Sequence, residues 1–151
     1  MRRWLVGSVL LAALCSAGAY AQSNQVVDRL LDEKAAVFGD AAYMILTAAG
    51  VVPETATGAD AVAAVNAAGY LHGSRTETQP ITLGEVCYLI MKTQKMKGGL
   101  LYSLLPGPRY ATRELAYLHI VKGVTHPGRT VTGEEVLRML ESAIEVAGGQ
   151  S

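Results

Sequence analysis

Apolar residues recur along most of the chain at spacings of three and four positions, which is the period of an amphipathic helix. The pattern is clear near the end of the chain, where Val136, Leu140 and Ile144 follow one another at intervals of four residues. No stretch alternates apolar and polar residues in the way that predicts a strand. The six apolar stripes begin at Val26, Ala41, Ala61, Val86, Leu115 and Val136. We therefore expect an all-α fold of about six helices.

Glycine follows five of these stripes, where a helix end often needs a residue in the left-handed conformation. These glycines are Gly50, Gly69, Gly98, Gly123 and Gly148. They predict the carboxyl ends of the second to sixth helices.

Two threonines predict helix starts, because a glutamate follows each of them three residues later. Thr82 precedes Glu85, and Thr132 precedes Glu135. In such a capping box the threonine oxygen accepts a hydrogen bond from the backbone N–H three residues on, and the glutamate accepts one from the N–H of the threonine. A weaker form of the motif spans residues 57–60, where aspartate replaces glutamate.

The two capping boxes belong to longer segments that repeat after about 50 residues. The repeated unit is a helix, a glycine, a loop, an apolar residue with a capping threonine, and a second helix. Two clear copies occupy about 61–97 and 112–147, and a shorter copy occupies about 40–66. A helix pair cannot bury its apolar face alone, so we expect stacked helix-loop-helix repeats in a single domain, residues 22–151, with an antiparallel or steeply crossed helix pair in each unit.

The loop and capping box of this unit resemble the S-layer homology module. Residues 69–71 (GYL) and 79–85 (QPITLGE) follow the pattern of that family, in which a helix ends in glycine and a loop leads to I-T-R-A-E at the start of a second helix. Residues 123–124 (GV) and 131–135 (VTGEE) resemble it again, and residues 38–40 (FGD) match its F-x-D opening.

The resemblance implies a tethering function in the cell envelope. Three such modules commonly form one functional unit, which attaches envelope proteins to polymers linked to peptidoglycan. Leu83 and Gly133 stand where the family has the arginine of I-T-R-A-E, and that arginine belongs to the polymer-binding motif. An envelope protein of helix pairs that binds no polymer therefore fits the sequence equally well.

The N-terminal 21 residues are typical of a cleaved signal peptide. Residues 1–3 include two arginines, residues 4–14 are apolar, and residues 19–21 read Ala-Tyr-Ala, an A-x-A cleavage site. An uncleaved anchor helix and a lipid on Cys15 are the alternatives. Leu14 precedes Cys15 where a lipobox has a small residue, so we expect cleavage, no lipid anchor and no transmembrane span in the mature chain.

Composition excludes several classes of protein. The chain has 151 residues, 13 basic and 13 acidic, and half of its residues are hydrophobic, which fits one globular domain and not a disordered chain. Cleavage would remove Arg2 and Arg3, so 13 basic residues become 11 and the net charge becomes −2, without the basic footprint of a nucleic-acid-binding protein. Cys87 would be the only remaining cysteine, so no intramolecular disulfide can form.

Candidate catalytic and metal-binding residues are few. Cys87 with His72, His119 and His126 would suit a cysteine nucleophile, but Cys87 lies beside an apolar stripe, where a lone cysteine usually packs as a small hydrophobe. The histidines are not clustered as zinc ligands, and we expect His119 to be a half-buried packing residue. We therefore expect no enzyme activity, no metal ion and no cofactor.

Residues 98–110 read GGLLYSLLPGPRY, a short leucine-rich stretch between glycines and prolines. One interpretation is a one-turn helix that caps the core between two units. The other is an apolar docking patch for a partner, with Leu101 and Leu104 as contact residues.

A basic helix start follows this stretch. Arg109 and Arg113 flank Tyr110 where Pro108 predicts the first turn of a helix. Such a group can hold a carboxylate or a phosphate, because the first N–H groups of a helix also attract anions. A solvated helix start, with Arg113 paired to a nearby acid, is the alternative.

These observations predict an exported cell-envelope protein that binds peptidoglycan or an envelope polymer and acts as a binding or scaffold module in the periplasm. A periplasmic helical protein that docks another envelope protein through residues 98–110 is the second hypothesis. A hydrolase that uses Cys87 is the third.

Overall fold

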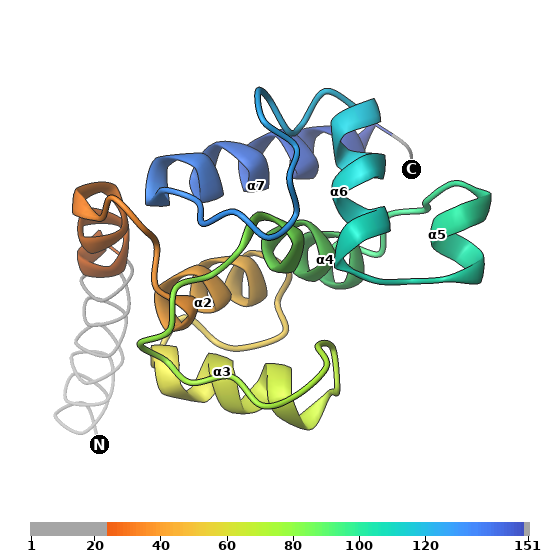
Figure 1. Cartoon of the computed structure of the whole chain (residues 1–151). Helices are drawn as coiled ribbons and strands as arrows, with labels where there is room; N and C mark the ends of the chain where they lie inside the picture. Colours follow the sequence, from red (N-terminus) through yellow and green to blue (C-terminus); the bar gives the residue numbers. More distant parts are fainter. Residues whose placement is uncertain (1–23, 150–151) are drawn as a thin grey trace, which may run out of the picture.

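The computed structural model describes residues 24–149, and these residues form an all-α fold, as predicted (Figure 1). The predicted leader (residues 1–21), its cleavage site and Cys15 lie outside the described residues. A first helix covers residues 24–32. The others are α2 (Phe38–Ala48), α3 (Gly58–Ala67), α4 (Leu83–Thr93), α5 (Leu100–Leu104), α6 (Pro108–Tyr117) and α7 (Gly133–Gly148). All except the short α5 correspond to a predicted apolar stripe.

The capping boxes form as the sequence predicts. Thr82 and Thr132 each accept a hydrogen bond from the backbone N–H of the glutamate three residues on, and each donates its own N–H to that glutamate. The weaker motif at 57–60 forms the same two bonds at the start of α3. The local sequence was thus sufficient to predict the starts of α3, α4 and α7.

Three of the five predicted helix ends are correct. Gly50 and Gly69 follow α2 and α3 with φ of 66° and 62°, the left-handed conformation expected of a glycine there. α7 ends at Gly148 as predicted, although Gly149 has a φ of −79°.

The predicted ends of α4 and α6 are wrong. α4 ends at Thr93 and α6 at Tyr117, several residues before the glycines that were expected to terminate them. The left-handed residues are Lys95, with a φ of 53°, and His119, with a φ of 58°. His119 is exposed, not half-buried as predicted, because its position turns the chain at the helix end.

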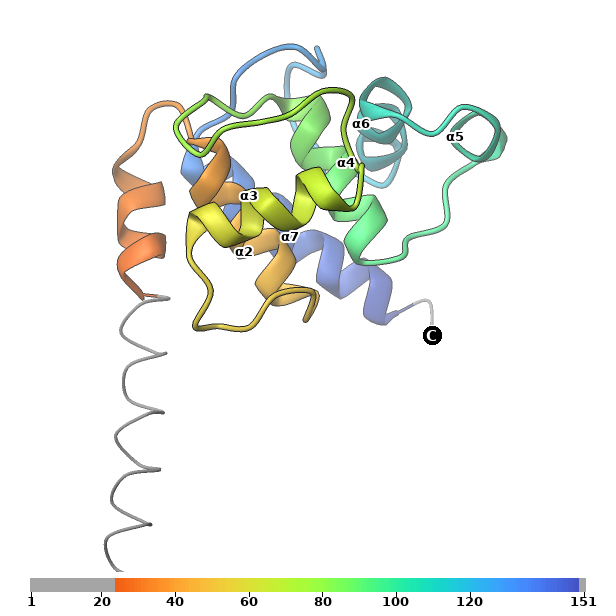
Figure 2. The same cartoon turned by 90° about the horizontal axis from the view of Figure 1, so that it is seen from below.

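The spatial pairing of helices agrees with the shorter predicted unit, about 40–66, and differs from the other two units. Within the described chain, α3 packs on α2 and α6 packs on α4, whereas α3 does not pack on α4 and α6 does not pack on α7. Thus α2 and α4 each pair with the long helix that follows them, whereas α7, the last helix of the described residues, contacts α2 and α4. Figure 2 gives a second view of this arrangement, with α5 projecting from one end of the molecule.

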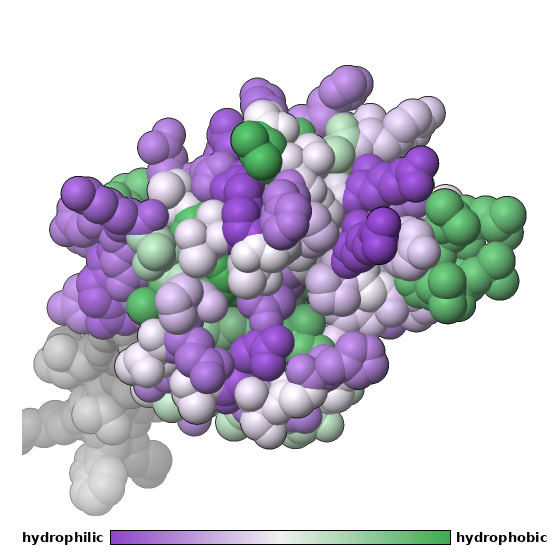
Figure 3. All heavy atoms as spheres, in the orientation of Figure 1, coloured by the Kyte–Doolittle hydropathy of each residue, from purple (hydrophilic) through white to green (hydrophobic). Residues whose placement is uncertain are grey.

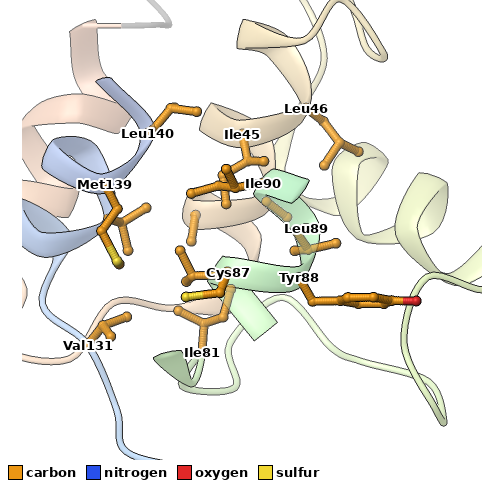
Figure 4. Close-up of a cluster of buried hydrophobic side chains, with 14 of the residues drawn as sticks. Ile45, Leu46, Ile81, Cys87, Tyr88, Leu89, Ile90, Val131, Met139 and Leu140 are labelled. Carbon is orange, nitrogen blue, oxygen red and sulfur yellow. The ribbon is translucent and has the colours of Figure 1, made fainter. Parts of the chain in front are cut away.

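The three helices α2, α4 and α7 meet in the centre and share one core. Figure 4 places Ile45 of α2, Ile90 of α4 and Leu140 of α7 side by side in it. Ile81 and Val131, the apolar residues before the two capping threonines, are fully or almost fully buried below them. Cys87, the cysteine within residues 24–149, is free, so burial of this shared apolar surface is the main stabilising contribution in this part of the chain.

The segments before these three helices are joined by backbone hydrogen bonds. The N–H of Ala36 donates to the carbonyl of Val131 (2.8 Å), and the N–H of Ile81 donates to the carbonyl of Ala36 (3.0 Å). Isolated β-bridges pair Val37 with Pro80 and Thr82 with Thr130. The three helix starts are thereby fixed next to one another, although 45 and 50 residues separate them in sequence.

A carboxylate occupies the third position of each central helix, and an arginine from the preceding segment binds it. Arg29 donates to both oxygens of Asp40 at 3.0 and 2.7 Å. Arg75 donates to Glu85 at 2.6 Å. Arg129 donates to both oxygens of Glu135 at 3.0 and 2.8 Å. We call these the three clasps (Arg29–Asp40, Arg75–Glu85 and Arg129–Glu135). They give the three helix starts the same local chemistry.

The third clasp predicts a pH-dependent stability. The hydrogen bonds from Arg129 lower the pKa of Glu135 from its ordinary value. A carboxyl whose folded pKa is lowered stabilises the fold above its unfolded pKa of about 4.3 and loses that contribution as the pH falls through the folded value. We expect Glu135→Gln to lower the free energy of unfolding by about 1 kcal/mol at pH 7, because the pair is partly exposed.

Urea unfolding of the variant and the wild type from neutral pH down to about pH 3 measures this effect. The difference between the two proteins should shrink as the pH falls below the ordinary carboxylate range. Glu141→Gln, on the exposed side of the same helix, is the matched control and should change little at any pH. A Glu135→Gln deficit that stays constant down to the lowest pH would contradict the clasp.

Candidate functional site

The candidate site consists of α5 and the first turns of α6. Gly98 and Gly99 precede α5, and Pro106 and Gly107 separate it from α6, so the helix is limited to five residues. It is held to the body through Tyr102, whose ring lies edge-on to that of Tyr88 with centroids 6.3 Å apart. Burial raises the pKa of Tyr102 to about 12, so its hydroxyl stays neutral.

The leucines of this segment point away from the core. Leu100 is 76%, Leu101 44%, Leu104 67% and Leu105 58% exposed. Figure 3 shows them as an apolar projection at one end of an otherwise mostly polar face. The one-turn helix forms, but its leucines do not cap the core, since only Tyr102 of α5 is buried. We refer to these four leucines as the leucine tip.

The first turns of α6 carry the predicted basic group. Pro108 is the first helical residue, and no acidic residue lies in the first turn. Arg109 and Arg113 are exposed, whereas Tyr110 is half-buried and packs against the core. Neither arginine takes part in the ion pairs found among residues 24–149, so the predicted pairing of Arg113 with an acid is absent there.

The structure brings only some of the predicted residues together. A hollow of about 310 Å³ is lined by Leu100, Leu101, Arg113, Glu114 and Tyr117. It joins the predicted leucine and arginine positions in one place on the α6 side of the leucine tip. Leu104, Arg109 and Tyr110 do not line it.

Sequence reasoning missed a second hollow on the other side of α5. This hollow, of about 430 Å³, lies between α5 and the end of α4 and is lined by Lys92, Lys97, Tyr102 and Ser103 together with Met96, Gly98 and Pro106. The Nζ of Lys92 lies 5.5 Å from the centre of the Tyr88 ring. The signal for it was the run of lysines at 92, 95 and 97 just before the leucines.

The residues considered for catalysis do not form a reactive group. Cys87 is fully buried in the shared core, and burial raises the pKa of its thiol to about 12, so the thiol is protonated at neutral pH. His72, His119 and His126 are all exposed. Among residues 24–149, no three histidine, cysteine or acidic side chains lie close enough to hold a metal ion together.

The length and the hydropathy of a helix decide whether it could cross a membrane. No helix within residues 24–149 combines the length and the apolar character that a bilayer span requires.

No family model, no curated protein and no solved structure matches this chain.

Proposed function

We propose that the chain is an exported, non-enzymatic binding module of the cell envelope that contacts peptidoglycan or an anionic polymer attached to it. The observation that carries this proposal is the set of three clasped helix starts around one core. It agrees with the three-module unit of the S-layer homology family, which the loops and capping boxes resemble. Residues 38–40, where the resemblance is shortest, begin the first of these helices.

The clasps bear on which arginines are free to contact such a polymer. Arg75 and Arg129 come from the loops before the two resembling motifs, but each is already hydrogen-bonded to the motif glutamate. They are not available in the way that the family's motif arginine is. We therefore assign polymer contact to Arg109 and Arg113 on α6, which are exposed and have no ion-pair partner among the described residues.

The chemistry of α6 suits an anionic group. Arg109 and Arg113 are four residues apart, so they lie on the same face of the helix, whereas Tyr110 between them packs partly against the core. Guanidinium groups bind carboxylates and phosphates through paired hydrogen bonds. The free backbone N–H groups of a helix start favour the same charge.

Cosedimentation with purified cell-wall sacculi tests the proposal. We expect wild-type protein to be retained at low salt and less at moderate salt, because the contact is between charges. Arg109→Ala with Arg113→Ala should weaken retention roughly tenfold or more, since each lost charge-assisted contact contributes about 1 kcal/mol. Lys34→Ala with Lys122→Ala removes two exposed cations elsewhere and is the matched control.

Two results would contradict polymer binding at α6. Absence of retention of the wild-type protein at low salt would end the proposal as a whole. Equal loss of retention in the lysine control and in the arginine variant would leave only a general charge effect and would remove α6 as the site.

A second candidate function is docking through residues 98–110, which the exposure of the leucine tip favours. Monomeric domains seldom display four neighbouring exposed leucines without a partner. In this function the module holds an apolar surface through Leu101, Leu104 and their neighbours, independently of any polymer at α6.

A further inference from the structure

The charged residues that flank the leucine tip in sequence are basic. Residues 86–113 contain no acidic residue and five basic ones, in a chain that has 13 basic and 13 acidic residues in total. The basic residues are Lys92, Lys95, Lys97, Arg109 and Arg113. All five are exposed, and three precede the tip while two follow it. The leucine tip is therefore flanked on both sides by positive charge.

The two hollows show how this charge is placed in space. On one side of α5, Lys92 and Lys97 line the larger hollow together with the hydroxyl-bearing Ser103. On the other side, Arg113 lines the smaller hollow beside Leu100 and Leu101. One acid, Glu114, shares that smaller hollow. Cations thus stand at the base of the projection and leucines at its end.

We propose that the leucine tip inserts into the surface of an anionic lipid membrane, with the flanking cations against the lipid phosphates. The inference deepens the docking function proposed above and rests on it, and it commits to a lipid surface as the partner. Apolar side chains that enter the boundary between headgroups and acyl chains, with lysine and arginine at headgroup level, are the arrangement by which proteins lie on a membrane without crossing it.

The shape of the segment favours lipid over a protein partner. The leucines lie at positions 100, 101, 104 and 105, so the helical period places them on one outward face of α5, and Tyr102 faces inward. The tip is convex and projects from the body in both views of the chain (Figures 1 and 2). A planar anionic surface can meet the tip and the cations on both sides of it at once. A protein would need an apolar pocket with acids on two opposite rims.

Flotation with lipid vesicles tests the inference on the full chain. We expect the protein to float with vesicles that contain phosphatidylglycerol, and much less with vesicles of phosphatidylcholine alone. Leu101→Ser with Leu104→Ser should weaken binding to the anionic vesicles roughly tenfold or more. Lys92→Glu with Lys97→Glu should weaken it by a similar factor and remove most of its salt dependence.

Matched controls lie at the opposite end of the molecule. Leu31 is 53% exposed on the first helix, and Lys34 is exposed just after it. Leu31→Ser and Lys34→Glu should leave vesicle binding unchanged. All of these flotation variants keep the same N-terminal residues. A difference in flotation between the tip variants and the control variants therefore reports on the tip alone.

A fluorescence measurement locates the contact. Trp4 is the only tryptophan of the chain, so Trp4→Phe combined with Leu104→Trp leaves a single fluorophore at the tip. Its emission should shift to the blue on addition of anionic vesicles and should be quenched by brominated acyl chains. The same fluorophore at Leu31 should show neither change.

Several outcomes would overturn the inference. Equal flotation of the leucine variant and the wild type, or an unshifted Leu104→Trp spectrum, would exclude insertion of the tip. Capture of an envelope protein or self-association that depends on Leu101 and Leu104, without vesicle binding, would assign the tip to a protein surface. Retention on sacculi is measured separately, so failure of the lipid contact and failure of polymer binding at α6 can be told apart.

Discussion

Replacing Gly133 with alanine should lower the free energy of unfolding by about 3 kcal/mol, close to the upper end of the usual cost of overpacking a core. Gly133 is the first residue of α7, and a Cβ there would overlap the backbone carbonyl of Leu30 in the helix 24–32. The obstructing atom belongs to the backbone, so no side-chain rotation can relieve the overlap. The first helix or the start of α7 must move.

Urea unfolding monitored by circular dichroism measures the loss, and Gly148→Ala is the matched control. Gly148 lies at the other end of the same helix, with no atom near the place of a Cβ, so alanine there should be neutral or slightly stabilising. Amide exchange adds a second measurement, because displacement of the first helix should reduce protection around Leu30. A Gly133→Ala protein as stable as the wild type would show that helix 24–32 does not pack on α7 in this way.

Local sequence predicted the helices well because their signals are local. The period of apolar residues and the hydroxyl–carboxylate caps act within one or two turns, so Thr82 and Thr132 could be assigned without knowledge of the fold. The class of fold followed from the same signals. An all-α chain needs only periodicity and caps to be recognised.

The ends of α4 and α6 could not be predicted in this way. Lys95 and His119 occupy the left-handed conformation where a glycine was expected. In each case the residue that follows is buried, and its N–H bonds back to the helix: Met96 to Met91 at 3.0 Å and Ile120 to Leu115 at 2.9 Å. Burial of that apolar residue offsets the strain of a side chain in this conformation, and burial is a property of the whole fold.

The pairing of helices and the exposure of the tip are also tertiary properties. The sequence repeat suggested that α3 would pack on α4, but repeats define similar units without saying which neighbours exchange contacts. Residues 98–110 were compatible with a buried cap or an exposed patch, because composition does not say which side of a short helix faces the core. Arg29 and Asp40 are eleven residues apart, and only the fold brings them together.

The second large effect is expected from Ile81→Ala in the shared core. Ile81 is fully buried, lies close to Cys87 and Val131, and its N–H is bonded to the carbonyl of Ala36. Replacement of a buried isoleucine by alanine removes buried apolar surface and leaves a cavity. The two effects together lower the free energy of unfolding by about 2–5 kcal/mol. Such a loss is a large fraction of the roughly 5–15 kcal/mol that stabilises an ordinary domain.

Ile144→Ala is the control for Ile81→Ala, since the same side chain is shortened at a position of α7 that is 44% exposed. The control should lower the free energy of unfolding by less than about 1 kcal/mol.

The two variants also test whether the three clasped helices unfold together. A single core predicts one transition for Ile81→Ala, shifted as a whole and coincident in far-ultraviolet and near-ultraviolet circular dichroism. If the modules were independent, the loss at Ile81 would move one of two separated transitions and leave the other in place. The clasped starts of α2, α4 and α7 would then be three repeats side by side, and the leucine tip would be attached to one module instead of to the whole body.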